Sequence, residues 1–440
     1  MHRGRNGPVP PAAGGQMNAL PDCVLEHILG FLPAAEAVQT CVLARRWRHL
    51  WKSATSLHIG DVGEPVRKLR EFVYHLLLLR RGAPLEVCDF YFDGFDEKDV
   101  PRVNLWFRYA VACNVRLLSL NALPPEGSGR RFLQLEDLPL VSQKLRILDL
   151  KFVRVNSTFL DFSGCPALKH LQFEFSEFSL SSETMTTISS ESLEHLSIVD
   201  SEFSDGSERS RIRIRTPNLL SLRLEHFQGK TPMLVSNMPS LAEASVRIDD
   251  NCDDSCKKLL DPNNLDCDCE SCGSSNNSSH VGLGCVLLLG LSAAKCLELT
   301  STRPMFIFQR DLRWYPMFSK LRTLTLNEYW CVSNDIGALA CILERSPVLE
   351  KLTLHLFSEV YGHKIEMKGR FNSMERSSVI SDHLEEVIIK CDVVDERILK
   401  VLKFLCAFNI CKQIRNSTCV SLFLTCAVCN NLHLGEIKVR

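Results

Sequence analysis

The sequence has almost no excess of charge of either sign. Its 440 residues include 51 lysines and arginines against 52 aspartates and glutamates, which gives a formal net charge of -1. A protein without a basic surplus has no overall electrostatic attraction to nucleic acid or to an anionic membrane, so we predict neither as a partner. Hydrophobic residues make up 45% and charged residues 23%, an ordinary globular composition that excludes a wholly disordered chain.

Long apolar runs are also missing. The longest, at residues 286–291 and 420–428, are shorter than the roughly 20 residues that a membrane-spanning helix needs. Residues 1–17 are rich in Gly, Pro and Ala and have no apolar stretch like that of a signal peptide, so we expect a disordered tail. We therefore predict an intracellular protein, in the nucleus, the cytoplasm or both, with most of its 20 cysteines reduced.

Enzyme motifs are absent as well. The chain has no H-E-x-x-H zinc motif and no G-x-S-x-G nucleophile elbow. Gly229-Lys230-Thr231 ends like a phosphate-binding loop, but Leu224 occupies the position of the first glycine of that motif. We therefore predict a protein that is not an enzyme, with no catalytic residue and no cofactor.

Helical signals crowd into residues 20–51. Asp22 is placed to cap a first helix, and the apolar positions of that helix recur at spacings of three and four: Leu25, Ile28, Leu29 and Leu32. Pro33 suits the first turn of a second helix, and residues 45–51 predict a third that carries two tryptophans. Three short helices bury too little apolar surface for a core of their own, so this unit must pack on another surface.

Most of the remaining chain repeats the pattern L-x-x-L-x-L. Good copies begin at Leu145, Leu168, Leu193, Leu219, Leu241, Leu321, Leu349 and Leu384, with weaker copies at Leu85, Val115 and Ala294. From Leu145 to Leu241 the starts are 22 to 26 residues apart, the period of a leucine-rich repeat with one short strand per turn. The predicted fold class is α/β: a short N-terminal helical unit followed by an irregular leucine-rich-repeat solenoid over residues 55–380. Residues 72–79 and 103–113 predict return helices.

In order and spacing, residues 20–51 resemble the F-box of plant F-box/leucine-rich-repeat proteins. The resemblance rests on Leu20-Pro21-Asp22, on the apolar helix positions, on Arg45-Arg46-Trp47 and on Leu50-Trp51. It implies an F-box at residues 18–54 that docks on a Skp-type adaptor, and through it on a cullin, while the repeats hold a target protein. The adaptor-binding residues would be Leu20, Pro21, Leu25, Ile28, Leu29, Leu32, Val38, Val42 and Leu43.

An alternative for these residues is that they only pack against the first repeat, a role that Trp47, Leu50 and Trp51 suit well. The resemblance extends to residues 381–411, which look like the start of the FBD segment of this family. Residues 412–440 form an atypical C-terminal tail. The family resemblance implies that the chain is a substrate-recognition subunit of an SCF ubiquitin ligase. The alternative function is a leucine-rich-repeat binding protein that does not enter a ligase.

Residues 249–280 interrupt the repeats with an acidic segment that is rich in Asn and Ser. It contains Cys252, Cys256, Cys267, Cys269 and Cys272, and the spacing of the first two and the last two is near that of a structural zinc module. Because the segment has few large apolar residues, we favour a solvated loop without metal. Four alternating arginines at Arg209, Arg211, Arg213 and Arg215 predict a solvated strand face, paired with this acidic segment, in preference to a phosphate site.

In an L-x-x-L-x-L strand the leucines point into the core, so the residues between them point outward on the strand face. Polar residues occupy many of these positions. We predict target-binding residues among them, on the concave face of the solenoid: Asp149, Lys151, Glu174, Arg223, Glu225, Arg247, Asn327 and His355. The alternative is that they are the solvated side of a sheet. Their mixed charge favours a protein target over nucleic acid.

Overall fold

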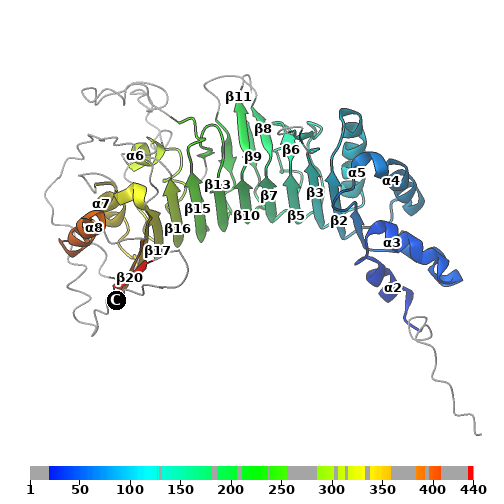
Figure 1. The fold of residues 1–440 in the computed structure, drawn as a ribbon, viewed down its shortest axis with the longest axis horizontal. Helices are drawn as coiled ribbons and strands as arrows, with labels where there is room; N and C mark the ends of the chain where they lie inside the picture. Colours follow the sequence, from blue (N-terminus) through cyan, green and yellow to red (C-terminus); the bar gives the residue numbers. More distant parts are fainter. Residues whose placement is uncertain are drawn as a thin grey trace, which may run out of the picture. The chain divides into compact units, whose positions relative to one another are not determined.

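The computed structural model describes residues 19–125, 127, 131–180, 186–205, 211–235, 237–254, 285–301, 306–312, 316–331, 337–357, 383–391, 396–407 and 435–439. The fold is mixed α/β, with helices at the N-terminal end followed by a strand-rich region (Figure 1). Two compact units can be distinguished. Unit 1 comprises Met1–Leu133 with Ser142–Asp149, and unit 2 comprises Gln134–Val141 with Leu150–Arg440. The predicted tail at residues 1–17 lies outside the described residues.

Unit 1 begins with short helical pieces. These are α2 (Asp22–Leu29), α3 (Ala34–Gln39) and the 3-10 turns η1 (Thr40–Val42), η2 (Arg45–Arg48) and η3 (Leu50–Ser53). Pro21 and Pro33 each directly precede a helix, where the missing N–H of proline costs no helical hydrogen bond. The sequence predicted one helix over residues 45–51. The structure has two 3-10 turns instead, because the backbone leaves the helical region at His49 (φ -125°).

The rest of unit 1 alternates strands with helices. Its elements are β1 (Ser56–Ile59), α4 (Val66–Arg80), β2 (Val87–Asp93), η4 (Glu97–Asp99), α5 (Val100–Ala112) and β3 (Leu117–Leu123). β1, β2 and β3 pair in parallel, so that Leu57 lies beside Cys88 and Cys88 beside Leu118. The two return helices predicted at residues 72–79 and 103–113 are confirmed as α4 and α5. β4 (Leu133–Gln134) and β5 (Ile147–Lys151) contain residues of both units.

A buried arginine joins the N-terminal helices to α4. The Arg80 guanidinium donates to the carbonyl oxygens of Trp51 at 3.0 Å and Ala54 at 2.8 Å, and its side chain is 3% exposed. Trp47, Leu50 and Trp51 are buried too. The Arg80 hydrogen bonds thus tie the end of the helical unit to α4, the next helix of the chain.

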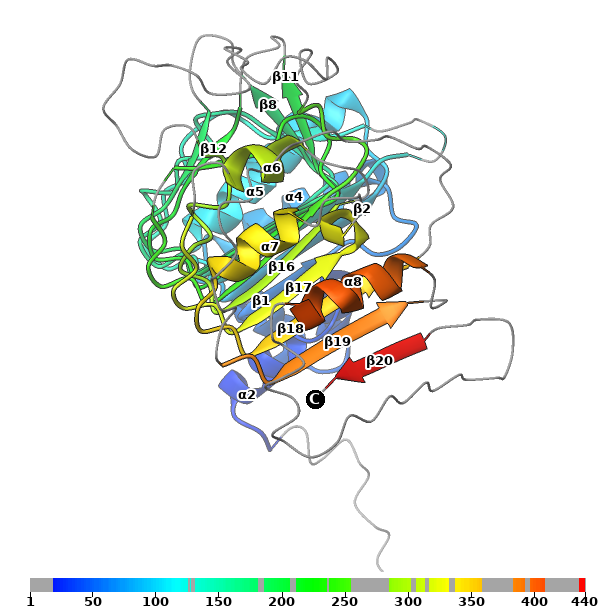
Figure 2. The ribbon, with the colours of Figure 1, turned by 90° about the vertical axis from the view of Figure 1, so that its left-hand side faces the viewer.

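Unit 2 contains a long parallel ladder. Its strands, in spatial order, are β7 (His170–Glu174), β10 (His195–Val199), β13 (Ser221–Glu225), β15 (Glu243–Ile248), β16 (Cys296–Ser301), β17 (Thr323–Asn327), β18 (Lys351–Leu356) and β19 (Glu386–Cys391). Figure 1 shows β7, β10, β13, β15 and β16 side by side. β20 (Gly435–Val439) pairs antiparallel with β19 and lies beside it in Figure 2.

Two smaller groups of parallel strands follow the ladder strands in unit 2. One contains β6 (Val153–Val155), β8 (Glu177–Leu180) and β11 (Glu202–Asp205), and the other contains β9 (Thr187–Ser189), β12 (Arg213–Arg215) and β14 (Met233–Leu234). The described helical pieces of unit 2 are α6 (Phe306–Leu312), η5 (Glu328–Cys331), α7 (Gly337–Glu344) and α8 (Glu396–Ala407). Segments as short as β6 and β9 carry too weak a periodic pattern for sequence analysis, and neither was predicted, whereas β12 lies within the strand predicted from the alternating arginines.

The leucine pattern explains why these strands align. Leu196, Leu222 and Ala244 occupy equivalent positions on β10, β13 and β15, and all three are buried. A slip of one residue would turn each of these side chains out of the core, so the pattern specifies the register. The backbone adds a second constraint before each strand. The Leu220 carbonyl, for example, accepts the N–H groups of both Ala242 and Glu243, at 2.8 and 3.0 Å.

Candidate functional site

The N-terminal helices divide the predicted adaptor-binding residues into two groups. Leu25 and Leu29 are 0% and 1% exposed, so they form the interior of the helical unit. Val42 and Leu43 are 82% and 68% exposed and have their side chains in solvent. The remaining members of the set are exposed or half-buried: Leu20, Pro21, Ile28, Leu32 and Val38.

Two further apolar side chains of this unit are exposed, and sequence analysis did not select either. Phe31 is 71% exposed and its ring contacts that of His27 edge-on, with centroids 4.9 Å apart. Val24, on α2, is 39% exposed. Val24, Phe31, Val42 and Leu43 are the exposed large apolar side chains of residues 20–53, and we call these four residues the apolar surface of unit 1. Exposed large apolar side chains can mark an interaction site.

A histidine holds the end of α2 against the first strand. His58 Nδ1 lies 2.7 Å from the Asp89 carboxylate, and its Nε2 forms a hydrogen bond with the Gly30 carbonyl at 2.9 Å. The hydrogen bond that His58 donates to Asp89, together with the charge of that carboxylate, raises the pKa of His58 above its ordinary value against the opposing effect of burial. Gly30 directly precedes Phe31, so this contact also positions the apolar surface.

The predicted target-binding residues of unit 2 lie on the strands, where the pattern placed them. Several are already paired with one another. Lys151 Nζ lies 2.5 Å from Glu174, and Arg223 donates to Glu225 at 2.7 Å. Burial tends to raise the pKa of Glu225, but hydrogen bonds from Arg223 and Ser245 outweigh it and hold the pKa below its ordinary range. Arg223 stays 56% exposed in its side chain despite this pairing.

Three other predicted residues differ in their surroundings. Arg247 donates to the Thr300 hydroxyl at 3.2 Å. The Asn327 side chain bonds the backbone N–H and carbonyl of Ser301, so it stabilises the junction of two strands. Burial, followed by the charge of Lys390, lowers the pKa of His355. Asp149 belongs to unit 1 and is half-buried on β5.

Comparison with known families identifies the helical unit. Residues 17–58 match the model of the F-box domain. Residues 17–58 are an F-box domain. The apolar surface of unit 1 thus lies on the F-box.

The chain has homologues among plant F-box/LRR-repeat and F-box/FBD/LRR-repeat proteins, which confirms the predicted resemblance. It is 29% identical over 394 residues to the meiotic F-box protein MOF of Oryza sativa subsp. japonica, covering 83% of this chain and 76% of that protein. It is 25% identical over 460 residues to an F-box/FBD/LRR-repeat protein of Arabidopsis thaliana, covering 97% and 92%. A second Arabidopsis F-box/FBD/LRR-repeat protein is 27% identical, covering 89% of each chain.

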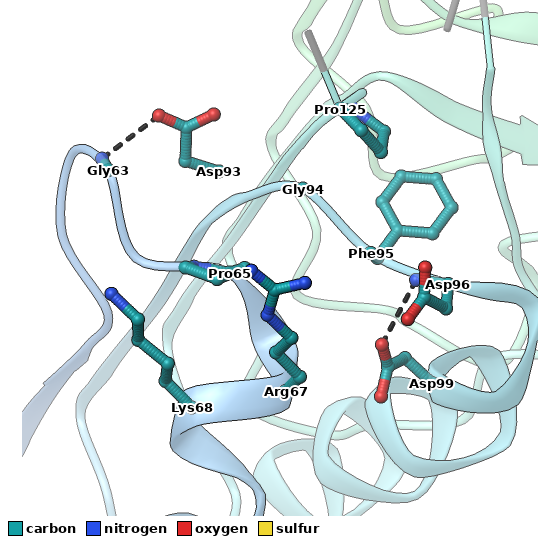
Figure 3. Close-up of a pocket in the computed structure, with 10 residues that line it drawn as sticks. All are labelled: Gly63, Pro65, Arg67, Lys68, Asp93, Gly94, Phe95, Asp96, Asp99 and Pro125. Atoms are coloured by element: carbon teal, nitrogen blue, oxygen red, sulfur yellow. Dashed lines mark hydrogen bonds between the residues drawn. The ribbon is translucent and has the colours of Figure 1, made fainter.

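A pocket of about 380 Å³ lies in unit 1, beside the first turn of α4 (Figure 3). Figure 3 shows Arg67 and Lys68 on α4, with the Asp93 carboxylate accepting the Gly63 N–H at 2.9 Å. Asp99 also borders it, but this carboxylate is occupied by Arg70 at 2.6 Å. Charges of both signs line the pocket, so its electrostatics favour no single class of ligand.

The first residues of the predicted acidic insertion are part of the packed structure. Asp254 is buried and receives a two-point hydrogen bond from Arg211, at 2.6 and 3.1 Å, and a third from the Thr231 N–H at 2.8 Å. The predicted pairing between the arginine row and the acidic segment is confirmed at Arg211. Arg209, and residues 255–280 with four of the five cysteines, lie outside the described residues.

The fifth cysteine of that segment is described. Burial, together with the nearby Asp254 charge, raises the pKa of Cys252 to about 12. The Cys252 thiol donates a hydrogen bond to the Asp254 carboxylate at 3.4 Å. Within the described ranges no three His, Cys, Asp or Glu side chains are grouped as metal ligands, and no helix is long and apolar enough to cross a bilayer.

Proposed function

We propose that the chain is the substrate-recognition subunit of an SCF ubiquitin ligase. The F-box binds a Skp-type adaptor, and through it a cullin, while unit 2 forms a leucine-rich-repeat solenoid that binds a target protein. The chain itself contributes no catalytic residue and no cofactor. Its role is to raise the effective concentration of target lysines near the ubiquitin carrier. The nucleus and the cytoplasm both suit such a role.

The observation that carries this proposal is the apolar surface of the F-box. Helices with exposed apolar side chains suit recognition by a partner that supplies a complementary groove. Val42 and Leu43 are adjacent, and burying each would contribute roughly 1.5–3 kcal/mol. Leu25 and Leu29 support the site indirectly, because they hold together the helices that present it.

The solenoid part of the proposal rests on the parallel ladder of unit 2 and on the relatives named as LRR-repeat proteins. One short strand per turn, with leucines in register, is what a leucine-rich repeat predicts. The polar residues between the leucines remain the proposed target-binding set. The predicted FBD-like segment at residues 381–411 includes β19 and α8, and we keep it as part of the same proposal.

The test is co-precipitation of the full chain with a Skp-type adaptor. We expect Val42→Asp combined with Leu43→Asp to weaken adaptor binding by about 100-fold or more, because two buried apolar contacts are lost and two carboxylates are desolvated. Leu105→Asp is the matched control, since Leu105 is 64% exposed on α5, outside the F-box. Normal adaptor binding by the double variant, with normal thermal stability, would refute the proposal.

Variants at buried positions distinguish a loss of adaptor binding caused by unfolding from one caused by the loss of a direct contact. Leu25→Ala should lower the stability of the F-box by about 2–5 kcal/mol, so any loss of adaptor binding would accompany unfolding. Val42→Asp with Leu43→Asp should leave the unfolding transition unchanged. The binding-protein alternative, in which the chain enters no ligase, predicts no adaptor binding by the unmodified chain.

A further inference from the structure

Four successive turns of unit 2 make the same unusual corner. Directly after their ladder strands, Phe152, Phe175, Asp200 and His226 have positive φ angles of 57°, 48°, 49° and 53°. The backbone N–H groups of the first three each donate to the neighbouring turn, at 3.0 to 3.1 Å. We call these four residues the corner row. Since all four share one backbone conformation, their side chains follow one another from turn to turn.

Buried serines stabilise the backbone of two of these positive-φ residues through hydrogen bonds. Ser176 and Ser201 follow the corner residues Phe175 and Asp200, and both are buried. The Ser201 hydroxyl donates to the Val199 carbonyl at 2.9 Å and accepts the Ser176 N–H at 3.3 Å. The Ser176 hydroxyl donates to the Glu174 carbonyl at 3.0 Å. Hydrogen bonds on both sides therefore hold the positive φ angles in place.

Phenylalanine is an unexpected residue at such a corner. Glycine and asparagine adopt positive φ readily, whereas a bulky side chain there is a conformational outlier. The rings of Phe152 and Phe175 nevertheless stack, with centroids 5.0 Å apart and planes 11° from parallel. Phe175 is 38% exposed, so the pair does not serve as core. Strained residues held by a rigid frame are found most often at functional sites.

A carboxylate comes next in the row. Asp200 occupies on its turn the position that Phe175 occupies on the turn before. Among the residues that the structure describes, its side chain has no hydrogen-bond or ion-pair partner. Further along, His226 lies 3.2 Å from the Asp249 carboxylate and 3.4 Å from an Arg247 nitrogen, so charged groups of both signs follow Asp200 in the row.

We propose that the stacked Phe152–Phe175 pair and Asp200 bind an arginine side chain on an extended segment of the target protein. A guanidinium is planar, stacks on an aromatic face and pairs with a carboxylate, and the corner row offers both groups on neighbouring turns. This inference rests on the proposed function, because it locates the target site of unit 2.

The direct test uses the purified full-length chain and a fluorescent Gly/Ser nonapeptide with one central arginine. A twin peptide with citrulline in that position keeps the shape and removes the charge. By fluorescence anisotropy at low salt, we expect the arginine peptide to bind at least about five-fold more tightly than its twin. Equal affinity of the two peptides would overturn the proposal, as would binding of an oligouridine probe that displaces the arginine peptide.

Substitutions in the corner row test whether these residues bind the arginine peptide. Phe175→Asn should weaken arginine-peptide binding about five-fold while the melting temperature stays level or rises, since asparagine tolerates positive φ. Asp200→Asn should weaken it about three-fold and reduce its salt dependence. Leu289→Asn and Asp253→Asn are the controls, as both positions are exposed in unit 2. Unchanged binding in Phe175→Asn would refute the inference.

Adaptor co-precipitation of the same variants separates this inference from the proposed function. If the adaptor binds but the two peptides are not distinguished, the inference fails and the ligase proposal stands. If the peptides are distinguished but the unmodified chain binds no adaptor, the ligase proposal fails and the arginine site stands.

Discussion

Replacing Asp254 by asparagine tests whether the predicted insertion begins inside the packed structure. The Asp254 side chain is 2% exposed and that of Arg211 is 15% exposed. Removing one partner of a buried ion pair costs about 3–5 kcal/mol, because the other charge remains uncompensated. Asparagine can keep the hydrogen bond from the Thr231 N–H, and Arg211 retains some contact with water. We therefore expect a loss of about 3 kcal/mol in the free energy of unfolding.

The loss should also depend on pH. Burial tends to raise the pKa of Asp254, but the charge and hydrogen bonds of Arg211, together with Thr231, hold it below its ordinary value. A carboxyl group whose pKa falls on folding stabilises the protein fully above its unfolded pKa of about 3.9. This stabilisation disappears as the pH falls through the folded pKa. The difference between the parent chain and Asp254→Asn should thus be constant near neutral pH and shrink in acid.

Urea unfolding followed by far-UV circular dichroism measures both effects. Asp253→Asn is the matched control, because Asp253 is the exposed neighbour. The double variant Arg211→Met with Asp254→Asn should lose less stability than Asp254→Asn alone, since no buried charge is left unpaired. If Asp254→Asn unfolds at the same urea concentration as Asp253→Asn, the assignment of this buried pair is wrong.

Deletions extend the same test to the insertion. Removing residues 249–280 with a short Gly/Ser bridge should cost at least as much as Asp254→Asn, because the deletion takes Asp254 with it. Removing only residues 258–280 should change stability little, because the entropy of loop closure depends weakly on loop length.

Two other predictions concern titration and metal content. His58→Gln should reduce stability most in acid, because the pKa of His58 is raised in the folded state. The stabilisation by His58 is therefore complete below its unfolded pKa of about 6.5 and disappears as the pH rises through the folded pKa. Urea unfolding midpoints at pH 5.5 and 8.5 measure this difference. Equal differences from the parent chain at both pH values would contradict it. Elemental analysis of the purified chain should find no stoichiometric zinc. If it finds about one equivalent of zinc, and if chelation removes both the zinc and the stability, the alternative of a structural zinc module is correct.

Sequence pattern predicted the ladder well, because leucines that recur at a near-constant period can be buried together only if the strands align. It predicted the F-box less completely. Leu25 and Leu29 fit an amphipathic helix, but periodicity does not show whether an apolar face meets the same chain or a partner. Phe31 follows the end of α2, outside any periodic run, and was therefore not selected as an adaptor-binding residue although it is part of the F-box resemblance.

The corner row could not have been predicted. Phenylalanine favours strands, and a positive φ at Phe152 or Phe175 arises only from the hydrogen bonds of neighbouring turns and of the buried serines. The Arg211–Asp254 pair was foreseen only as a charge match between two segments. Its two-point geometry depends on Thr231, which lies on a third segment.

The shared carbonyl before each ladder strand makes strand pairing independent of the length of the connection. The same two-hydrogen-bond junction joins Leu220 to Ala242 and Glu243, and joins Ala242 to Lys295 and Cys296 across the whole acidic insertion. After each junction the strands pair in parallel with their core positions aligned, Leu222 beside Ala244 and Ala244 beside Leu297. Connecting segments can therefore lengthen, shorten or be exchanged without a change of register elsewhere. Such an architecture can alter what one turn binds while it leaves the neighbouring turns intact.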